Sequence, residues 1–191
     1  KTHPKMTALL AEQAALRFKR AIQIGEKLAK VGVENAFEGA KALADGEVTR
    51  AHYARYLVQI GKVANDNQAF KKYLSQGKSC YVKSEWCDIP TAINVIHQSG
   101  GISVLVHPLR YTMTNRAIRR LIADFARWGG RAMEVSGCGQ SPEQRQLLAD
   151  WANEQGLMGS VGSDFHFPCQ WVELGKSLWL PQGVEPVWNA L

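Results

Sequence analysis

Three side chains that could bind a metal ion follow two apolar segments of this 191-residue sequence. His107 comes directly after the apolar run from Ile102 to Val106, and Asp164 and His166 come shortly after the run from Leu157 to Val161. Each run is short enough for a buried strand. In parallel α/β folds, chemistry gathers at the carboxyl ends of the strands. Because imidazole and carboxylate groups suit Zn, Mn or Fe, the pattern predicts that these three residues are catalytic metal ligands.

A structural role is the alternative for each histidine, since a buried imidazole can make hydrogen bonds within the protein without binding a metal. A third apolar run, from Ala132 to Val135, contains Glu134 within or at the end of the middle strand. This carboxylate could support a metal ligand through a hydrogen bond, but the sequence favours a structural role. Metal analysis of His107→Ala would separate the two interpretations for His107.

Periodicity and capping residues divide the chain into a helical part and an alternating part. In the first part, the sequence predicts helices over residues 7–30, 34–43 and 67–74. It also predicts a helix that begins with Thr49 as its N-cap. A loop is expected from 75 to 89. Beyond it, the three strand candidates alternate with helices predicted at residues 90–98, 115–128 and 142–155. Such alternation is typical of parallel β/α units.

The number of strands indicates a partial architecture. Three strand–helix units cannot close a barrel, and a parallel sheet needs cover on both faces. We therefore expect an α/β fold, the C-terminal part of a larger barrel, with residues 1–88 as a helical subdomain and residues 89–191 as the β/α units. A partial barrel would expose sheet edges, through which chains could form oligomers.

Composition and charge restrict the environment and the partners. The net charge of +6 and the pI of about 9.2 favour phosphate-bearing partners, although many soluble proteins carry this charge without one. No window approaches the roughly 18 apolar residues of a membrane span, and no signal peptide opens the sequence. The cysteines, Cys80, Cys87, Cys138 and Cys169, match no zinc or redox motif. Free thiols and a cytoplasmic location are expected, and a Cys80–Cys87 disulfide is disfavoured.

Several arginines have spacings that suit phosphate binding. Arg17 and Arg20 lie three apart on one predicted helix face, so both can reach one phosphate. Arg50 and His52 lie at a predicted helix N-terminus, which favours anions. Arg110 closely follows the first predicted metal ligand and could hold substrate. The alternatives are a solvated helix face for the first pair, and capping and packing for the second.

Six segments carry a resemblance to a known family. They are V-L-V-H-P-L-R-Y at 104–111, A-M-E-V at 132–135, G-S-D-F-H at 162–166, V-T-R-A-H-Y-A-R-Y-L at 48–57, F-K-K-Y-L at 70–74 and G-K-S-L-W-L-P at 175–181. The first three resemble the PHP phosphoesterases, named for polymerase and histidinol phosphatase. The others are similar to the bacterial RNase AM branch, 5′-to-3′ exoribonucleases also active on nucleoside 3′,5′-bisphosphates. The resemblance covers nearly the whole chain.

The resemblance implies a distorted (β/α)₇ barrel with an inserted helical subdomain and a cluster of two or three divalent metals, most often Mn, with Fe or Zn as alternatives. His107, Asp164 and His166 match the family's last ligand positions. The earlier ligands come from an N-terminal H-x-H motif, which this sequence lacks. The cluster is therefore expected to be incomplete and the chain inactive by itself. The family's substrate-binding positions fall near Arg17–Ala21 and Arg50–His52.

Two classes of function follow. The first is a manganese-dependent phosphoesterase of RNA processing, in which the arginines hold the terminal phosphate of an RNA 5′ end or a nucleoside bisphosphate. The second is a non-catalytic PHP-like module that binds or scaffolds, which the missing H-x-H motif favours if the chain is a natural product of this length. A metal-dependent hydrolase of amides is disfavoured by the paired arginines and the basic charge.

Overall fold

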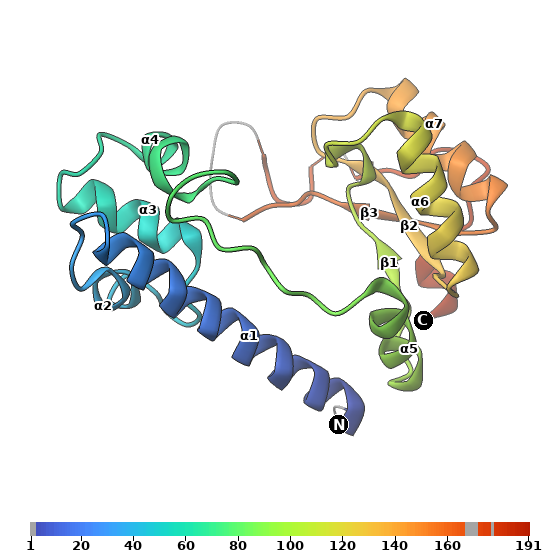
Figure 1. Cartoon of the computed structure of the whole chain (residues 1–191). Coiled ribbons are helices and arrows are strands. Elements are labelled where there is room, and N and C mark those ends of the chain that lie inside the picture. The colour runs from blue at the N-terminus through green and yellow to red at the C-terminus, as the bar shows by residue number, and fades with distance from the viewer. Residues whose placement is uncertain (1–2, 167–171, 177) are drawn as a thin grey trace. The chain divides into compact units, whose positions relative to one another are not determined.

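The computed structural model describes residues 3–166, 172–176 and 178–191 of the chain. The chain divides into two compact units. One runs from Thr7 to Cys87 and consists of helices; the other runs from Asp88 to Leu191, together with residues up to Met6, and alternates strands with helices (Figure 1). Cys169, one of the cysteines named above, lies outside the described residues.

The helical unit confirms the predicted helices, with one correction. Its elements are α1 (Pro4–Ala29), α2 (Ala36–Lys41), α3 (Arg50–Gln59), α4 (Asp66–Ala69) and the π-helix η1 (Phe70–Leu74). The single α-helix predicted over residues 67–74 is wrong. Asn65 caps a one-turn α4 by accepting the N–H of Gln68 at 3.0 Å, and the following turn widens, so that Ser75 N–H donates to the carbonyl of Phe70 at 2.9 Å. A short element of this kind has no periodicity that distinguishes it from an ordinary helix.

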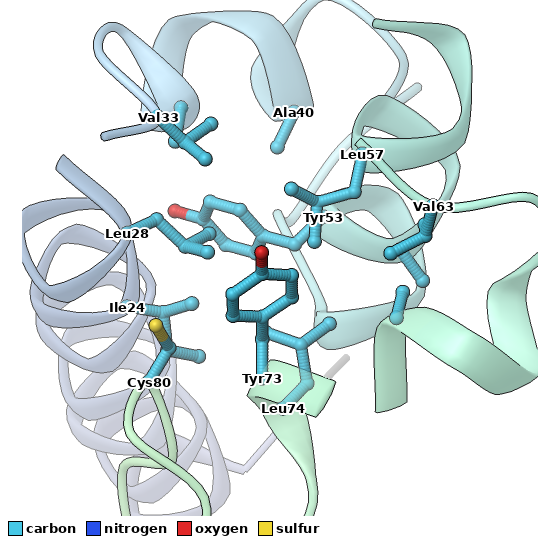
Figure 2. Packing of buried hydrophobic residues seen from close by; sticks show 13 residues of the cluster. Ile24, Leu28, Val33, Ala40, Tyr53, Leu57, Val63, Tyr73, Leu74 and Cys80 are labelled. Atoms are coloured by element: carbon cyan, nitrogen blue, oxygen red, sulfur yellow. The ribbon is translucent and has the colours of Figure 1, made fainter. Parts of the chain in front are cut away.

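The core of this unit joins all of its helices. Figure 2 shows Tyr53 and Leu57 of α3 packed among Leu28 of α1, Leu74 of η1 and Cys80 of the following loop, and all five are fully buried. The hydroxyl of Tyr53 donates a hydrogen bond to the carbonyl of Ala21 at 2.6 Å. Burial raises the pKa of Tyr53 well above its usual range, so this hydroxyl stays protonated. The unit therefore has its own hydrophobic core.

Tyr53→Phe is expected to lower the free energy of unfolding by about 1 kcal/mol, because it removes one buried hydrogen bond without changing the packed volume. Urea denaturation followed by circular dichroism measures this change. Tyr56→Phe, at a half-buried position of the same helix, is the matched control and should change stability by less than about 0.5 kcal/mol. Equal effects of the two substitutions would contradict the role of the buried hydroxyl.

The second unit confirms the predicted parallel β/α units. Its strands β1 (Val104–Leu105), β2 (Ala132–Gly137) and β3 (Met158–Gly162) form a parallel sheet in the order β1-β2-β3. Its helices are α5 (Ile89–Gln98), α6 (Asn115–Arg127) and α7 (Pro142–Glu154), and short 3₁₀ turns lie at Pro108–Arg110 (η2) and Val187–Ala190 (η3). The first strand is shorter than the predicted 102–106 run. Ser103 nevertheless accepts the backbone N–H of Ala132 at 3.0 Å, so pairing begins before regular strand geometry does.

Helices α6 and α7 pack their apolar residues against the middle strand. Met133 and Val135 of β2 share a buried cluster with Ile122 of α6 and Leu148 of α7. Every residue of β2 is buried, as expected for the central strand of a parallel sheet. The pairing register with β3 shifts between Glu134 and Ser136, which marks a β-bulge.

Three smaller expectations can be compared with the described residues. Cys80 and Cys87 are free cysteines, as predicted. None of the helices in the described part of the chain is long and apolar enough to cross a membrane. The start of the helix predicted at residues 142–155 is also confirmed, because the hydroxyl of Ser141 accepts the N–H of Gln144 at 3.3 Å as the N-cap of α7.

Candidate functional site

The carboxyl ends of the three strands surround a cavity of about 170 Å³. Its lining comprises His107, Leu109, Arg110, Glu134, Gly137, Cys138, Gly139, Gln140, Gln144 and Gly162. Most of these residues end a strand or belong to the loop that follows it. The structure therefore places His107 and Arg110, two of the predicted site residues, on the wall of one cavity. We call it the strand-end cavity.

Two of the predicted metal ligands have a backbone conformation that is uncommon for their residue type. His107 has φ 37° and ψ 51°, and Asp164 has φ 55°, both in the left-handed region. Within the described ranges, Asn35 alone joins them as a non-glycine residue with positive φ. Strained backbone of this kind gathers at functional sites, where the surrounding structure holds it in place. The observation supports a functional role for both residues.

The carboxylate of Asp164 lies between a guanidinium and an imidazole. Arg110 donates a hydrogen bond to it and forms an ion pair with it. The Nδ1 of His166 lies 3.7 Å from the same carboxylate and donates to the backbone carbonyl of Asp164 at 2.8 Å. A histidine that ligates a metal commonly donates its other ring N–H to such a carbonyl, which leaves Nε2 with its lone pair. The Asp164–His166 pair thus has donor atoms that fit a divalent metal.

His107 also has an unused nitrogen. Its Nδ1 is buried and has no hydrogen-bond partner in the described part of the chain. The ring meets the edge of Tyr111 with the centroids 5.7 Å apart, and the Tyr111 hydroxyl donates to the carbonyl of Val106 at 2.7 Å. Buried nitrogens without a partner are uncommon in folded proteins and need an explanation. A metal ion in the strand-end cavity would supply the missing partner.

The three predicted ligands are nevertheless not assembled into one set. Among residues 3–166, 172–176 and 178–191, no group of three or more His, Cys, Asp or Glu side chains has an arrangement that could hold a metal ion. Asp164 and His166 are together, and His107 is not joined to them in a single ligand group. The Arg110 guanidinium, rather than a second imidazole, supplies the positive charge next to Asp164.

Glu134 takes a larger part in the site than its sequence context indicated. Glu134 lines the strand-end cavity, and its carboxylate interacts with the backbone of His107. Burial raises its pKa, while the contact with His107 opposes the rise. A Cβ added at Gly137 or at Gly162 would lie 3.0 Å from a carboxylate oxygen of Glu134. The available signal was a charged residue inside an otherwise apolar strand, which the sequence interpretation assigned to structure.

A second cavity, of about 150 Å³, lies within the helical unit. Its lining comprises Leu16, Arg17, Arg20, Ala21, Ile24, Val48, Thr49, Arg50, Ser84, Glu85 and Trp86. Three arginines predicted to bind substrate thus line one cavity, which we call the arginine cavity. Burial, followed by the nearby charge of Arg50, lowers the pKa of Arg20. Because two cations repel each other there, an anion between them would be stabilised.

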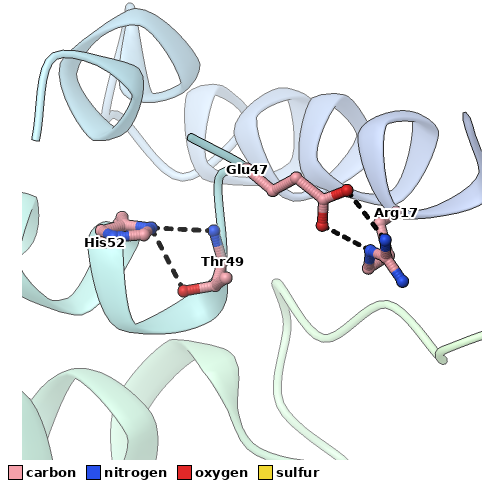
Figure 3. A network of polar contacts seen from close by, with 4 residues as sticks. All are labelled: Arg17, Glu47, Thr49 and His52. Carbon is pink, nitrogen blue, oxygen red and sulfur yellow. Dashed lines mark hydrogen bonds and ion pairs between the residues drawn. The ribbon is translucent and has the colours of Figure 1, made fainter. Parts of the chain in front are cut away.

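Arg17 is held at the rim of the arginine cavity by two neighbours. Its Nε and Nη2 donate to the carboxylate of Glu47 at 2.5 and 2.8 Å (Figure 3), and its guanidinium lies 5.8 Å from the ring centroid of Trp86. The two-pronged pair fixes the orientation of the planar guanidinium. Its contribution to stability is small, because both side chains are well exposed to solvent.

His52 has a different environment from the arginines. Its Nδ1 accepts the backbone N–H of Thr49 at 3.0 Å and lies 3.2 Å from the Thr49 hydroxyl (Figure 3). This contact caps the N-terminus of α3 and orients the backbone of Arg50, which follows Thr49. His52 is not among the residues that line the arginine cavity. Its capping contact is the alternative that the sequence left open, and substrate binding by His52 stays a prediction.

Positive charge is unevenly divided between the two units. The helical unit has 13 Lys and Arg residues against 8 Asp and Glu residues, a net charge of +5. The other unit has 10 against 9, a net charge of +1. The excess that suggested phosphate-bearing partners therefore belongs mainly to the unit that contains the arginine cavity.

Comparisons with known proteins give closely related sequences. The chain is 68% identical over 189 residues to a 5′-3′ exoribonuclease of Haemophilus influenzae. The alignment covers 99% of this chain and 69% of that protein. It is 36% identical over 191 residues to a 3′,5′-nucleoside bisphosphate phosphatase of Chromobacterium violaceum, of which it covers 67%. The chain thus spans about two thirds of the length of these relatives. No protein-family model matches the sequence.

Solved structures agree with these relatives. A Chromobacterium violaceum protein described as an amidohydrolase, with bound sulfate, superposes with a TM-score of 0.84 at 36% identity over 98% of this chain and 66% of its own. A Bifidobacterium adolescentis protein described as a metal-dependent phosphoesterase superposes with a TM-score of 0.72 at 25% identity over 93% of this chain and 63% of its own. The identity and coverage shown by the Haemophilus relative establish that the chain belongs to the bacterial 5′-3′ exoribonuclease family, a family of phosphoric ester hydrolases.

Proposed function

We propose that this chain belongs to a metal-dependent phosphoesterase of PHP type that releases mononucleotides from RNA 5′ ends and dephosphorylates nucleoside 3′,5′-bisphosphates. The proposal is supported by the names of its relatives, an exoribonuclease and a bisphosphate phosphatase. Release of mononucleotides from RNA and dephosphorylation of a nucleoside bisphosphate are the same reaction. Water adds to phosphorus, and the ester oxygen leaves with a proton. The product is a 5′-mononucleotide in either case.

The observation that carries the proposal is the grouping of Arg17, Arg20 and Arg50 around one cavity. A guanidinium presents parallel N–H donors that match the oxygens of a phosphate monoester, and the pairing gains strength from opposite charges. The sulfate in a related structure is an anion of the same shape and charge class as phosphate. We infer that the arginine cavity binds the terminal phosphate of the substrate.

The chemical step is assigned to the ends of the strands. Asp164, His166 and His107 offer one carboxylate and two imidazoles, a donor set that suits a divalent metal such as Mn, Fe or Zn. A divalent metal, when bound, supplies polarisation of the phosphoryl oxygens. Arg110, paired with Asp164, is placed to neutralise charge on the phosphate that is attacked. Glu134 lines the same cavity, next to the backbone of His107.

Hydrolysis is expected to need more ligands than this chain supplies, because three separate donor residues are too few for a cluster of two metals. The test compares the 191-residue chain with a form extended to the length of its relatives, each with 5′-phosphorylated oligoribonucleotides, nucleoside 3′,5′-bisphosphates and Mn²⁺. Chromatography should show 5′-mononucleotides from the extended form. Absence of product from both substrates with the extended, metal-loaded form would overturn the proposal.

Arg50→Gln is expected to raise the KM of the extended form by about 10- to 100-fold with little change in kcat, because it removes charge-assisted hydrogen bonds to a phosphate that does not react. Steady-state kinetics with a nucleoside 3′,5′-bisphosphate measures this effect. Arg55→Gln makes the same change at an exposed position of α3 outside the cavity, and should leave KM within about twofold. Equal KM values for both variants would remove Arg50 from the phosphate site.

A non-catalytic RNA-binding module is the second candidate. It is favoured by the absence of an assembled metal-ligand group among the described residues. Retention of RNA by the extended form, together with no bound metal and no turnover, would support the module over the enzyme.

A further inference from the structure

The helical unit contains another basic cavity next to the arginine cavity. It measures about 140 Å³ and is lined by Leu16, Lys19, Arg20, Gln23, Val82, Lys83 and Glu85. The two cavities share Leu16, Arg20 and Glu85, so they are neighbours, and Arg20 borders both. We call the second one the lysine cavity. Lys19 and Arg20 lie in the Arg17–Ala21 stretch that the family resemblance assigns to substrate binding, whereas Lys83 lies outside it.

Two hydrogen bonds join α1 to the segment that precedes Lys83. The Nε of Arg20 donates to the carbonyl of Val82 at 2.9 Å, and the Nζ of Lys27 donates to the carbonyl of Tyr81 at 2.6 Å. Both donors come from α1, and they hold the segment that carries Lys83 against this helix. Arg20 uses one of its five N–H donors in this contact, so its guanidinium can serve a ligand as well.

The charges of the two cavities exceed what one phosphate can balance. The two cavities and the Arg17 partner contribute five positive and two negative side chains, an excess of three positive charges. The cations are Arg17, Lys19, Arg20, Arg50 and Lys83, and the anions are Glu47 and Glu85. A phosphate monoester carries about −1.5 to −2 at neutral pH. A monoester in the arginine cavity therefore leaves positive charge unbalanced in its neighbour, where a further phosphate would be stabilised.

The residue types indicate which phosphate each of the two cavities would bind. Arginine pairs with the oxygens of one phosphate in a fixed geometry, whereas lysine acts as a compact point charge on a flexible chain. Lysine is therefore suited to a second phosphate that is covalently attached to the phosphate bound by the arginines, because that attachment already sets its position. The second phosphate must lie close to the first, since Arg20 borders both cavities. Phosphates joined by an anhydride satisfy this requirement.

We propose that the lysine cavity binds the outer phosphates of a 5′-di- or triphosphorylated RNA end, with Lys19 and Lys83 as its cationic residues. The proposal rests on the proposed function, in which the arginine cavity holds the phosphate attached to the first ribose. It extends the substrate class to RNA ends that still carry a polyphosphate. Binding, rather than cleavage of the anhydride, is what the cavity supplies.

Three oligoribonucleotides of one sequence, with 5′-hydroxyl, 5′-monophosphate and 5′-triphosphate ends, test the proposal on the 191-residue chain. Fluorescence anisotropy in EDTA measures Kd without hydrolysis. The parent chain should bind the triphosphate end about tenfold more tightly than the monophosphate end. The double variant Lys19→Gln/Lys83→Gln should reduce this ratio to about one and leave the ratio of monophosphate to hydroxyl unchanged.

The matched control is Lys71→Gln/Lys72→Gln, which makes the same change in net charge at exposed positions of the same unit. It should keep the tenfold ratio, and loss of the ratio in this control would show a general charge effect and overturn the proposal. Equal affinity of the parent chain for monophosphate and triphosphate ends would overturn it too. Equal affinity for hydroxyl and monophosphate ends would instead overturn phosphate binding by the arginine cavity, and with it the proposed function.

Discussion

Asp164→Asn is expected to lower kcat/KM of the extended form by about 100- to 1,000-fold, with both RNA ends and nucleoside bisphosphates as substrates. Asparagine tolerates the left-handed backbone that Asp164 adopts, so the substitution removes the negative charge without straining the turn after β3. Without that charge the Asp164–His166 pair loses its anionic donor, and Arg110 loses its ion-pair partner. Steady-state kinetics and circular dichroism of the same sample separate chemistry from folding.

Asp124→Asn is the matched control for this experiment. Asp124 lies in α6 and pairs with Arg127 at 2.7 Å, so the variant also loses one carboxylate and one ion pair. Its kcat/KM should stay within about twofold of the parent, because surface ion pairs contribute little. If Asp164→Asn retained kcat/KM within about threefold of the parent, the carboxylate would have no part in the reaction.

His107→Asn is expected to weaken Mn²⁺ binding to the extended form by at least about 10- to 100-fold. The buried Nδ1 of His107 has no protein partner among the described residues, so a bound metal ion would satisfy it. Isothermal titration with Mn²⁺ and elemental analysis of the purified protein measure the loss. Asparagine again suits the left-handed backbone, whereas His107→Ala would add strain to the loss of the imidazole.

His97→Ala provides the comparison for metal binding. His97 lies in the last turn of α5, and its Nε2 lies 3.3 Å from the hydroxyl of Ser103, so its imidazole already has a partner. Removing it should leave the Mn²⁺ affinity unchanged. Should His107→Asn also leave metal content and affinity unchanged, His107 would be a structural residue and the metal site would lie elsewhere.

Much of the fold could be predicted from local signals. Capping residues located helix starts well, as at Thr49 and Ser141, because a cap depends on residues only three apart. Strand–helix alternation correctly predicted a parallel sheet. The π-helix at Phe70–Leu74 could not be predicted, since nothing in the sequence of this turn distinguishes it from an ordinary helix.

The site could be predicted only in part, because its geometry depends on contacts between distant segments. Spacing on one helix indicated that Arg17 and Arg20 lie near each other, but it could not show that Arg50 lines the same cavity. The ion pair between Arg110 and Asp164 joins residues 54 apart in the chain. Glu134 was underestimated because the β-bulge that accompanies its strand has no sequence signal of its own.

The left-handed backbone of His107 limits how the site can be redesigned. A cysteine or glutamate installed at position 107 to attract a different metal would adopt a conformation that costs about 1–2 kcal/mol for most L-residues. His166 has no such constraint and is well exposed, so a new ligand there would meet no backbone strain. Directed evolution toward other metals should therefore accumulate changes at position 166 before position 107.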